Sequence, residues 1–187
     1  MDEFSDESAL VAENWNAVLD IIRARERLDD ELTELLFSVG PYLEELEWWD
    51  QGWQFWTYKK EVYIRNSNWL NEDGYVVLWI GAYNFDAAHV FGLASPPQFY
   101  ARTRKDCQDL QQILTEKTKA AGHEVTEGHR HFIRRDILKC ATQRQAVEEY
   151  PNLVREQLTD LFSEYANLLM QFDETIRQYI QEMESSA

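Results

Sequence analysis

Three side chains that could bind a metal ion lie close together after Gly122: Glu127, His129 and His131. Alternate side chains of an extended segment point to the same side, so these three can share one face. Two histidines with a carboxylate form a ligand set that zinc or iron accepts, which makes a metal-dependent hydrolase centred on His129 and His131 one hypothesis. The set matches neither an HExxH nor a CxxC motif, and Gly122 and Gly128 favour a loop. We therefore assign no metal ligands.

Other catalytic templates are missing from the sequence. It contains no GxSxG, no GxxxxGK[ST] and no GxGxxG motif. Its two cysteines, Cys107 and Cys140, form neither a disulfide framework nor a metal-binding pair, and ordinary buried thiols explain them. No catalytic residue and no cofactor is predicted, and a non-enzymatic protein is favoured.

Two acidic ladders are the first candidate for a binding surface. Each has three carboxylates at four-residue intervals, which places them on one face of a helix: Glu26, Asp30 and Glu34, and then Glu156, Asp160 and Glu164. Neighbours at this spacing are roughly 5–6 Å apart, and each like-charge pair costs about 0.2–0.5 kcal/mol. One interpretation is mimicry of nucleic-acid phosphates, which would direct the protein to a basic groove. The alternative is a solvated helix face.

The charge of the whole chain is distributed in three blocks. Residues 1–50 carry 15 acids against three arginines, residues 51–150 carry 12 acids against 13 bases, and residues 151–187 carry seven acids against two arginines. The net charge of −16 argues against direct binding of nucleic acid or of an anionic membrane. A basic protein is the expected partner, although adaptation to high salt would also explain the acidity.

Aromatic residues are the second candidate. Six of the seven tryptophans fall within residues 48–79, and tyrosines are interleaved with them. Such side chains dominate binding hot spots and also stack on bases. Trp48 and Trp49 are expected as an exposed corner for partner binding, whereas Tyr75, Trp79 and Tyr83 are the candidates for a ligand-stacking surface. Packing in the core is the competing explanation for more than half of these rings.

Basic residues gather in the otherwise neutral middle of the chain, in two short groups: Arg102, Arg104 and Lys105, and Arg130, Arg134 and Arg135. They are interpreted either as a counterface for the acidic helices within the molecule or as an anion site.

The elements that must position these residues follow from hydrophobic spacing. Residues 8–38 have the helical pattern, as one helix or two, and Gly40-Pro41 is expected to end it. Residues 53–64 and 75–85 are expected to form a β-hairpin with a long loop, because both are rich in aromatic and β-branched residues. Residues 87–93 are a candidate third strand.

The second half of the chain is expected to be mainly helical. A helix over 104–121, an edge strand over 131–138 and a short polar helix near 144–149 precede a long helix that begins at Pro151. The fold class is therefore α+β, with a small antiparallel sheet of about three to four strands flanked by long amphipathic N- and C-terminal helices. Residues 1–187 are expected to form one domain, with a mobile start over 1–8.

Three functions remain open. The leading one is an acidic interaction protein, an accessory or inhibitor that docks on a basic, nucleic-acid-handling partner, as phage or prokaryotic anti-defence proteins do. The second is a sensor of a small ligand or nucleotide that uses the aromatic sheet face, and the third is the hydrolase. No apolar run reaches 18 residues and the start lacks a signal-peptide pattern, so a cytoplasmic protein without membrane contact is expected. The broad apolar stripe of the last helix would also allow a homodimer.

Overall fold

A computed structural model describes residues 5–50, 52–90, 92–126, 130–138 and 143–185. The helices are, in chain order, α1 (Asp6–Glu13), α2 (Trp15–Phe37), α3 (Gly40–Glu44), α4 (Ala87–Val90), α5 (Gln108–Ala120), α6 (Gln143–Glu164) and α7 (Ala166–Ser185), with a 3₁₀ turn, η1 (Ser67–Trp69). The strands are β1 (Trp53–Tyr58), β2 (Glu61–Asn66), β3 (Leu78–Tyr83), β4 (Gln98–Thr103) and β5 (Ile133–Asp136). The α+β class is confirmed.

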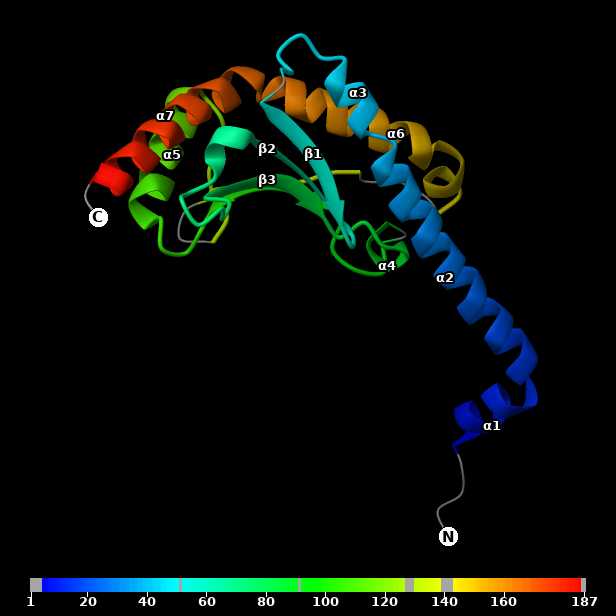
Figure 1. The fold of residues 1–187 in the computed structure, drawn as a ribbon. Coiled ribbons are helices and arrows are strands. Elements are labelled where there is room, and N and C mark those ends of the chain that lie inside the picture. The colour runs from blue at the N-terminus through cyan, green and yellow to red at the C-terminus, as the bar shows by residue number, and fades with distance from the viewer. Residues whose placement is uncertain (1–4, 51, 91, 127–129, 139–142, 186–187) are drawn as a thin grey trace.

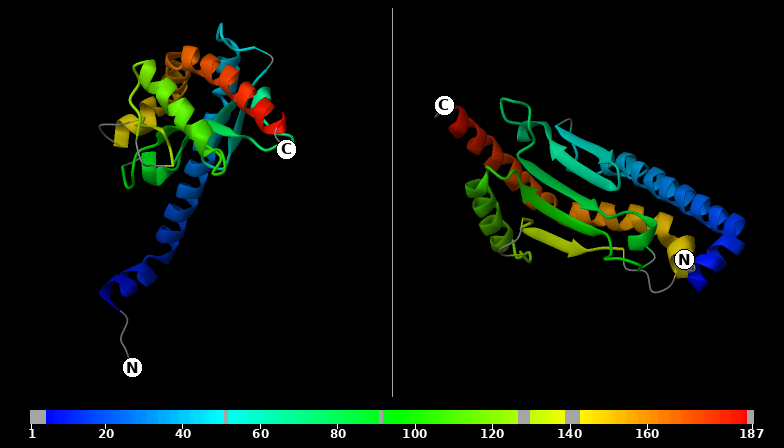
Figure 2. Two further views of the ribbon diagram at one scale, coloured as in Figure 1. Left: turned by 90° about the vertical axis from the view of Figure 1, so that its left-hand side faces the viewer. Right: turned by 90° about the horizontal axis from the view of Figure 1, so that it is seen from below.

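The sheet is antiparallel throughout, in the order β1-β2-β3-β4-β5. It has five strands, more than the three to four expected. It arches beneath α6 and α7, which cover its upper face from end to end (Figure 1). Seen from below, the strands lie in front and these two helices behind them (Figure 2, right).

The core lies between the upper face of the sheet and the two long helices. Strand residues that point upward are fully or nearly fully buried, among them Ile64, Ile80 and Phe99. The ring of Phe99 packs edge-on against Phe162 of α6, with centroids 5.5 Å apart. Phe172 of α7 is fully buried in the same core.

Two expectations about the strands are wrong, and one strand was not predicted. Residues 53–64 do not form one strand, because Lys59 adopts a positive φ of 54° and turns the chain between β1 and β2. Residues 87–93 do not add a strand, since Ala87–Val90 is helical. Strand β4, which directly follows Pro96-Pro97, was not expected at all.

The helix ends also differ from expectation. Helix α2 ends at Phe37, close to the expected end at residue 38, but Gly40-Pro41 is the start of the short helix α3, with proline in its first turn, where a missing N–H costs nothing. Pro151 does not begin a helix; it lies inside α6. The long C-terminal helix is divided at Tyr165 into α6 and α7. The edge position of β5 is confirmed.

Candidate functional site

The N-terminal helices form an arm that extends away from the sheet and its helices (Figure 1; Figure 2, left). We call residues 6–27, which comprise α1 and the first part of α2, the N-terminal arm. No residue of α1 is buried, and the buried residues of α2 are Leu32 and Leu36, both beyond the arm. Large apolar side chains on the arm are exposed, with Leu10 at 62 %, Trp15 at 53 % and Ile21 at 68 % exposure.

The base of the arm is attached to the body through Asp29. Its carboxylate accepts a hydrogen bond of 3.0 Å from the backbone N–H of Ala87, at the start of α4, and lies 3.7 Å from the ammonium of Lys60. Lys60 also donates to Asp86 at 3.0 Å. These contacts join α2, the β1–β2 turn and α4 at one point.

Asp86 organises the α4 end of this attachment. Its carboxylate accepts hydrogen bonds from the backbone N–H of His89 (3.0 Å) and from the ring Nδ1 of that residue (2.5 Å). Partial burial acts to raise the pKa of Asp86, but the hydrogen bonds from His89 and Lys60 outweigh it and lower the pKa to about 2.

The two acidic ladders lie on different helices. Glu26, Asp30 and Glu34 are exposed on α2. Glu156, Asp160 and Glu164 are exposed on α6, but Glu164 accepts two hydrogen bonds from Arg135, at 2.8 and 2.9 Å. The second ladder is therefore partly neutralised within the molecule, whereas the first begins inside the N-terminal arm, at Glu26, and continues along α2.

The tryptophan corner is packed more closely than expected. Trp48 and Trp49 are half-buried, with ring centroids 5.5 Å apart, and Trp48 meets Trp53 edge-on at 5.3 Å. Trp53 in turn contacts the fully buried Trp69. This corner therefore extends the core, and only its outer rings remain accessible to a partner.

The lower face of the sheet carries rings and guanidinium groups, and we call it the open face: Trp56, Tyr63, Arg65, Trp79, Tyr83, Tyr100, Arg102 and Arg134. The guanidinium of Arg65 lies 4.9 Å from the Trp56 ring, and that of Arg102 lies 5.5 Å from Trp79 and 5.4 Å from Tyr100. Trp56 and Tyr63 stack at 4.9 Å. Helices α6 and α7 cover the opposite face of the sheet, so on this side the rings and guanidinium groups, held by cation–π and stacking contacts, lie over the strands.

A chain of hydrogen bonds fixes one end of the open face. Gln98 accepts from the Tyr83 hydroxyl and from Arg134 Nε (2.9 Å), and its amide donates to Asp136 at 2.8 Å. Tyr100, next to this chain, is 1 % exposed, and burial raises the pKa of its phenol. Within the described residues, the Tyr100 hydroxyl and Arg102 Nε are buried without a hydrogen-bond partner.

The three residues expected to form a ligand-stacking surface separate in the structure. Trp79 and Tyr83 lie on the open face, half-buried, whereas Tyr75 precedes β3 and is 62 % exposed. The guanidinium of Arg104 lies 5.6 Å from the Tyr75 ring. Tyr75 thus belongs to the neighbourhood of a second feature, a cavity beside α5.

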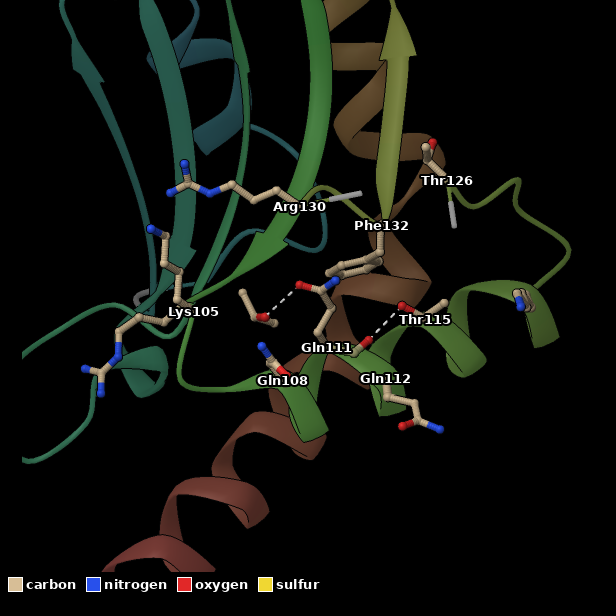
Figure 3. Close-up of a pocket in the computed structure, with 11 residues that line it drawn as sticks. Lys105, Gln108, Gln111, Gln112, Thr115, Thr126, Arg130 and Phe132 are labelled. Atoms are coloured by element: carbon tan, nitrogen blue, oxygen red, sulfur yellow. Dashed lines mark hydrogen bonds between the residues drawn. The ribbon is translucent and has the colours of Figure 1, made fainter. Parts of the chain in front are cut away.

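This cavity has a volume of about 540 Å³ and lies between α5, the end of β4 and the segment before β5 (Figure 3). Among the described residues that line it, four are basic and none is acidic: Arg104, Lys105, Lys119 and Arg130. Glutamines and threonines supply the other polar groups, and Phe132 supplies an apolar wall. We call it the cationic pocket. Of the six basic residues that the sequence analysis grouped together, three line this cavity: Arg104, Lys105 and Arg130. The sequence did not predict which of the six would meet.

Of the three residues considered as a metal-binding set, only His131 lies in the described part of the chain. His131 packs against Tyr100 and Tyr83, with ring centroids 4.8 and 5.9 Å away. Glu127 and His129 lie outside the described residues, as does Cys140. Among the residues that the structure describes, no three His, Cys, Asp or Glu side chains are grouped to hold a metal ion. Cys107 is buried, and burial raises the pKa of its thiol.

Comparison with known proteins gives no relatives. The chain matches no protein-family model, no curated protein and no solved structure. Within the described residues, no helix is long and apolar enough to cross a membrane.

Proposed function

We propose that this protein is a non-enzymatic interaction protein that docks on a basic partner through its N-terminal arm and the acidic ladder at the arm's base. The observation that carries the proposal is the exposed apolar row of the arm. Trp15 and Ile22 lie seven residues apart on α2 and are 53 % and 46 % exposed. A helix that contributes only to its own domain buries such a row.

The dimensions of the arm suit a helix-in-groove interaction. Helix α2 has 23 residues, which gives it a length of about 35 Å, and only its last third contributes buried residues. Recognition of this kind uses apolar anchors at intervals of three, four and seven residues, which Trp15, Val18 and Ile22 provide.

Charge favours a basic partner over a second copy of the chain. Helices α1 and α2 together carry nine acids and three arginines. Two such helix pairs would repel one another, whereas a basic groove would gain from the ladder Glu26, Asp30 and Glu34. Mimicry of phosphates by this ladder is the specific form that we propose, with a nucleic-acid-handling protein as the partner and an inhibitor or accessory role as the outcome.

The experiment compares retention of partners from a cell lysate by four matched proteins. In the first pair, Glu26, Asp30 and Glu34 are changed to lysine on the arm side, and Glu116, Glu174 and Glu184 are changed to lysine elsewhere as a control. The second pair removes one exposed apolar side chain from each region. Trp15→Ser changes the arm, and Leu93→Ser is its control, because Leu93 lies outside the arm and is 77 % exposed.

We expect the wild type and both controls to retain a basic protein, and both arm variants to lose it. Salt or competing duplex DNA should release this protein from the wild type. Equal retention by arm variants and controls would contradict the proposal. A second copy of this chain as the only retained protein would replace it with self-association.

A second candidate function is supported by the open face, namely binding of a planar ligand between its rings. The unpartnered Tyr100 hydroxyl and Arg102 Nε are the observation that favours it, since buried polar groups ordinarily have partners. Trp79 lies beside Arg102, so a ligand there should quench tryptophan fluorescence. A quench that a Trp79→Leu variant loses would support this function, and a flat titration with nucleotides would argue against it.

A further inference from the structure

The register of the sheet arranges the side chains of the open face in three rows that run across the strands. Directly opposed residues of neighbouring strands lie side by side, and successive rows on one face are about 7 Å apart, because a strand rises about 3.4 Å per residue. The β2–β3 ladder, extended by one residue at each end, aligns Arg65 with Trp79 and Glu61 with Tyr83. We call them the first, second and third rows: Gln54, Arg65, Trp79 and Arg102; then Trp56, Tyr63, Gly81, Tyr100 and Arg134; then Tyr58, Glu61, Tyr83, Gln98 and Asp136.

Charge is divided between the first row and the third. In the first row, Arg65 and Arg102 lie on either side of Trp79, and none of the four residues is acidic. In the third row, the charged residues are Glu61 and Asp136, and both are acidic. Two row intervals, about 13 Å, separate the two rows. A ligand that lies along the strands therefore meets cations at one end and carboxylates at the other.

Arg65 is the cation of the first row that is best placed for an anion. Its Nε donates to Gln54 at 2.9 Å and its guanidinium lies 4.9 Å from the Trp56 ring, so the side chain is held without a carboxylate. Among the described residues, Arg65 forms no salt bridge. It lies on β2, and β3 and β4 separate it from β5. The guanidinium thus keeps N–H groups that can donate to a ligand.

Arg102 adds positive charge on the other side of Trp79. Its guanidinium contacts the rings of Trp79 and Tyr100, at 5.5 and 5.4 Å, and its Nε is buried without a hydrogen-bond partner among the described residues. The charge of Arg102 acts to lower the pKa of Glu61, but burial of that carboxylate is the larger effect and raises the pKa. Arg102 is therefore partly compensated by Glu61, whereas Arg65 is the main contact for an anion.

Rings beside these cations offer a surface for stacking. Trp56 and Tyr63 are stacked, with centroids 4.9 Å apart and an interplanar angle of 13°. Trp56 and Trp79 are half-buried, so part of each indole is accessible. Every nucleic-acid base has a π face that stacks on such rings. In the second row, the buried Tyr100 hydroxyl has no hydrogen-bond partner within the described residues, although buried polar groups ordinarily have one. The open face thus combines a place for a planar ring with a cation next to it.

We propose that the open face binds a nucleoside monophosphate, with its phosphate at the first row and its base on the rings of Trp79 and Trp56. Arg65 donates to the phosphate oxygens in the paired geometry that a guanidinium offers, and Arg102 adds charge. The acids of the third row repel a phosphate, which fixes the direction of the ligand and disfavours a long polyanion that would extend onto them. This inference rests on the second function proposed above, binding of a planar ligand, and adds the charge and the direction of that ligand.

The test is isothermal titration calorimetry of the full chain with the four common nucleoside monophosphates, their nucleosides and ribose 5-phosphate. We expect at least one monophosphate to bind, with affinity falling as salt rises. Its nucleoside and ribose 5-phosphate should bind at least tenfold more weakly, because one lacks the acidic group and the other lacks the base. Arg65→Gln and Trp79→Leu should each weaken binding of the monophosphate at least tenfold.

Each of these variants has a matched control. Arg135→Gln makes the same charge change on the same sheet, but Arg135 pairs with Glu164 of α6. Trp15→Leu removes an indole from the N-terminal arm. Both controls should bind the monophosphate as the wild type does, and circular dichroism should show all four variants folded.

The outcomes separate this inference from the function on which it rests. Equal affinity for a monophosphate and its nucleoside, unchanged by Arg65→Gln, would overturn the phosphate contact and leave a planar ligand in place. Equal affinity for ribose 5-phosphate would overturn the stacking on Trp79. Absence of binding by all of these compounds would overturn both the inference and the planar-ligand function. Equal losses in the control variants would also overturn the inference, as would tighter binding of a single-stranded oligonucleotide, which would indicate a nucleic-acid surface.

Discussion

The N-terminal arm and the sheet body treat the same kinds of side chain in opposite ways. In the body, Phe172 and Trp69 are fully buried between the sheet and α7, while arginines and rings cover the open face. On the arm, Trp15 and Ile21 are more than half exposed. The comparison teaches that apolar spacing on a helix predicts a buried stripe but not what buries it. For the body it is the domain's own sheet; for the arm we propose a partner.

The largest expected effect distinguishes the two regions by stability. Phe172→Ala should destabilise the protein by about 3–5 kcal/mol, because it leaves a cavity in the core. Trp15→Ala should change the free energy of unfolding by less than about 0.5 kcal/mol, since its ring is largely in solvent. Urea unfolding of both variants measures this, and similar losses would show that the arm packs on the body.

Acid should weaken the junction between the two regions. The pKa of Asp86 is about 2 in the folded protein, below its ordinary value of 3.8. Because this pKa is lower in the folded than in the unfolded protein, the Asp86 carboxylate stabilises the fold at any pH above its unfolded pKa. This stabilisation is lost as the pH falls from about 4 toward 2. Allowing for solvent screening, the contribution is on the order of 1–2 kcal/mol. Asp86→Asn should flatten this part of the stability profile, and an unchanged profile would contradict the role of Asp86.

Removal of the Asp29 carboxylate should loosen the base of the arm. Asp29→Ala deletes the acceptor for the Ala87 N–H, a contact like a helix cap, at a cost of about 1 kcal/mol. Hydrogen exchange should rise at the start of α4 and in the second half of α2, and Asp30→Ala, an exposed neighbour, is the control. Equal changes in the two variants would argue against this attachment.

The smallest expected effect concerns the ion pair between Arg135 and Glu164. Both side chains are nearly half exposed, and exposed pairs contribute about 0–1 kcal/mol. Glu164→Gln should therefore lower the melting temperature slightly, and only at low salt. A large loss at high salt would mean that the edge strand depends on this pair more than its exposure indicates.

Sequence patterns predicted the helices and strands whose formation depends mainly on residues close by in the chain. The alternation in β3 and the spacing in α5 are local, and both elements formed as expected. The β1–β2 turn was missed because Lys59 is not a residue type that marks a positive φ. Helix α4 was missed because Asp29, 58 residues earlier, and Asp86 together accept the N–H groups at its start.

The candidate sites depended more strongly on the tertiary fold. Arg102 and Arg134 face the open side of the sheet, whereas Arg135, one residue on, faces the helices and pairs with Glu164. The register of β5 against β4 decides which of these side chains faces the helices, and the local pattern of residues in β5 does not predict that register. The cationic pocket likewise needs the end of β4, the segment before β5 and α5 to converge.

The most direct test of the central claim is hydrogen exchange measured by mass spectrometry on the protein alone and with a partner that the lysate experiment retains. Alone, residues 6–27 should exchange quickly, because few contacts protect these helices. With the partner, we expect strong new protection over residues 6–34 and little change on the open face. Protection of the open face or of α7, with the arm still exchanging quickly, would contradict the account and place the binding surface on the body.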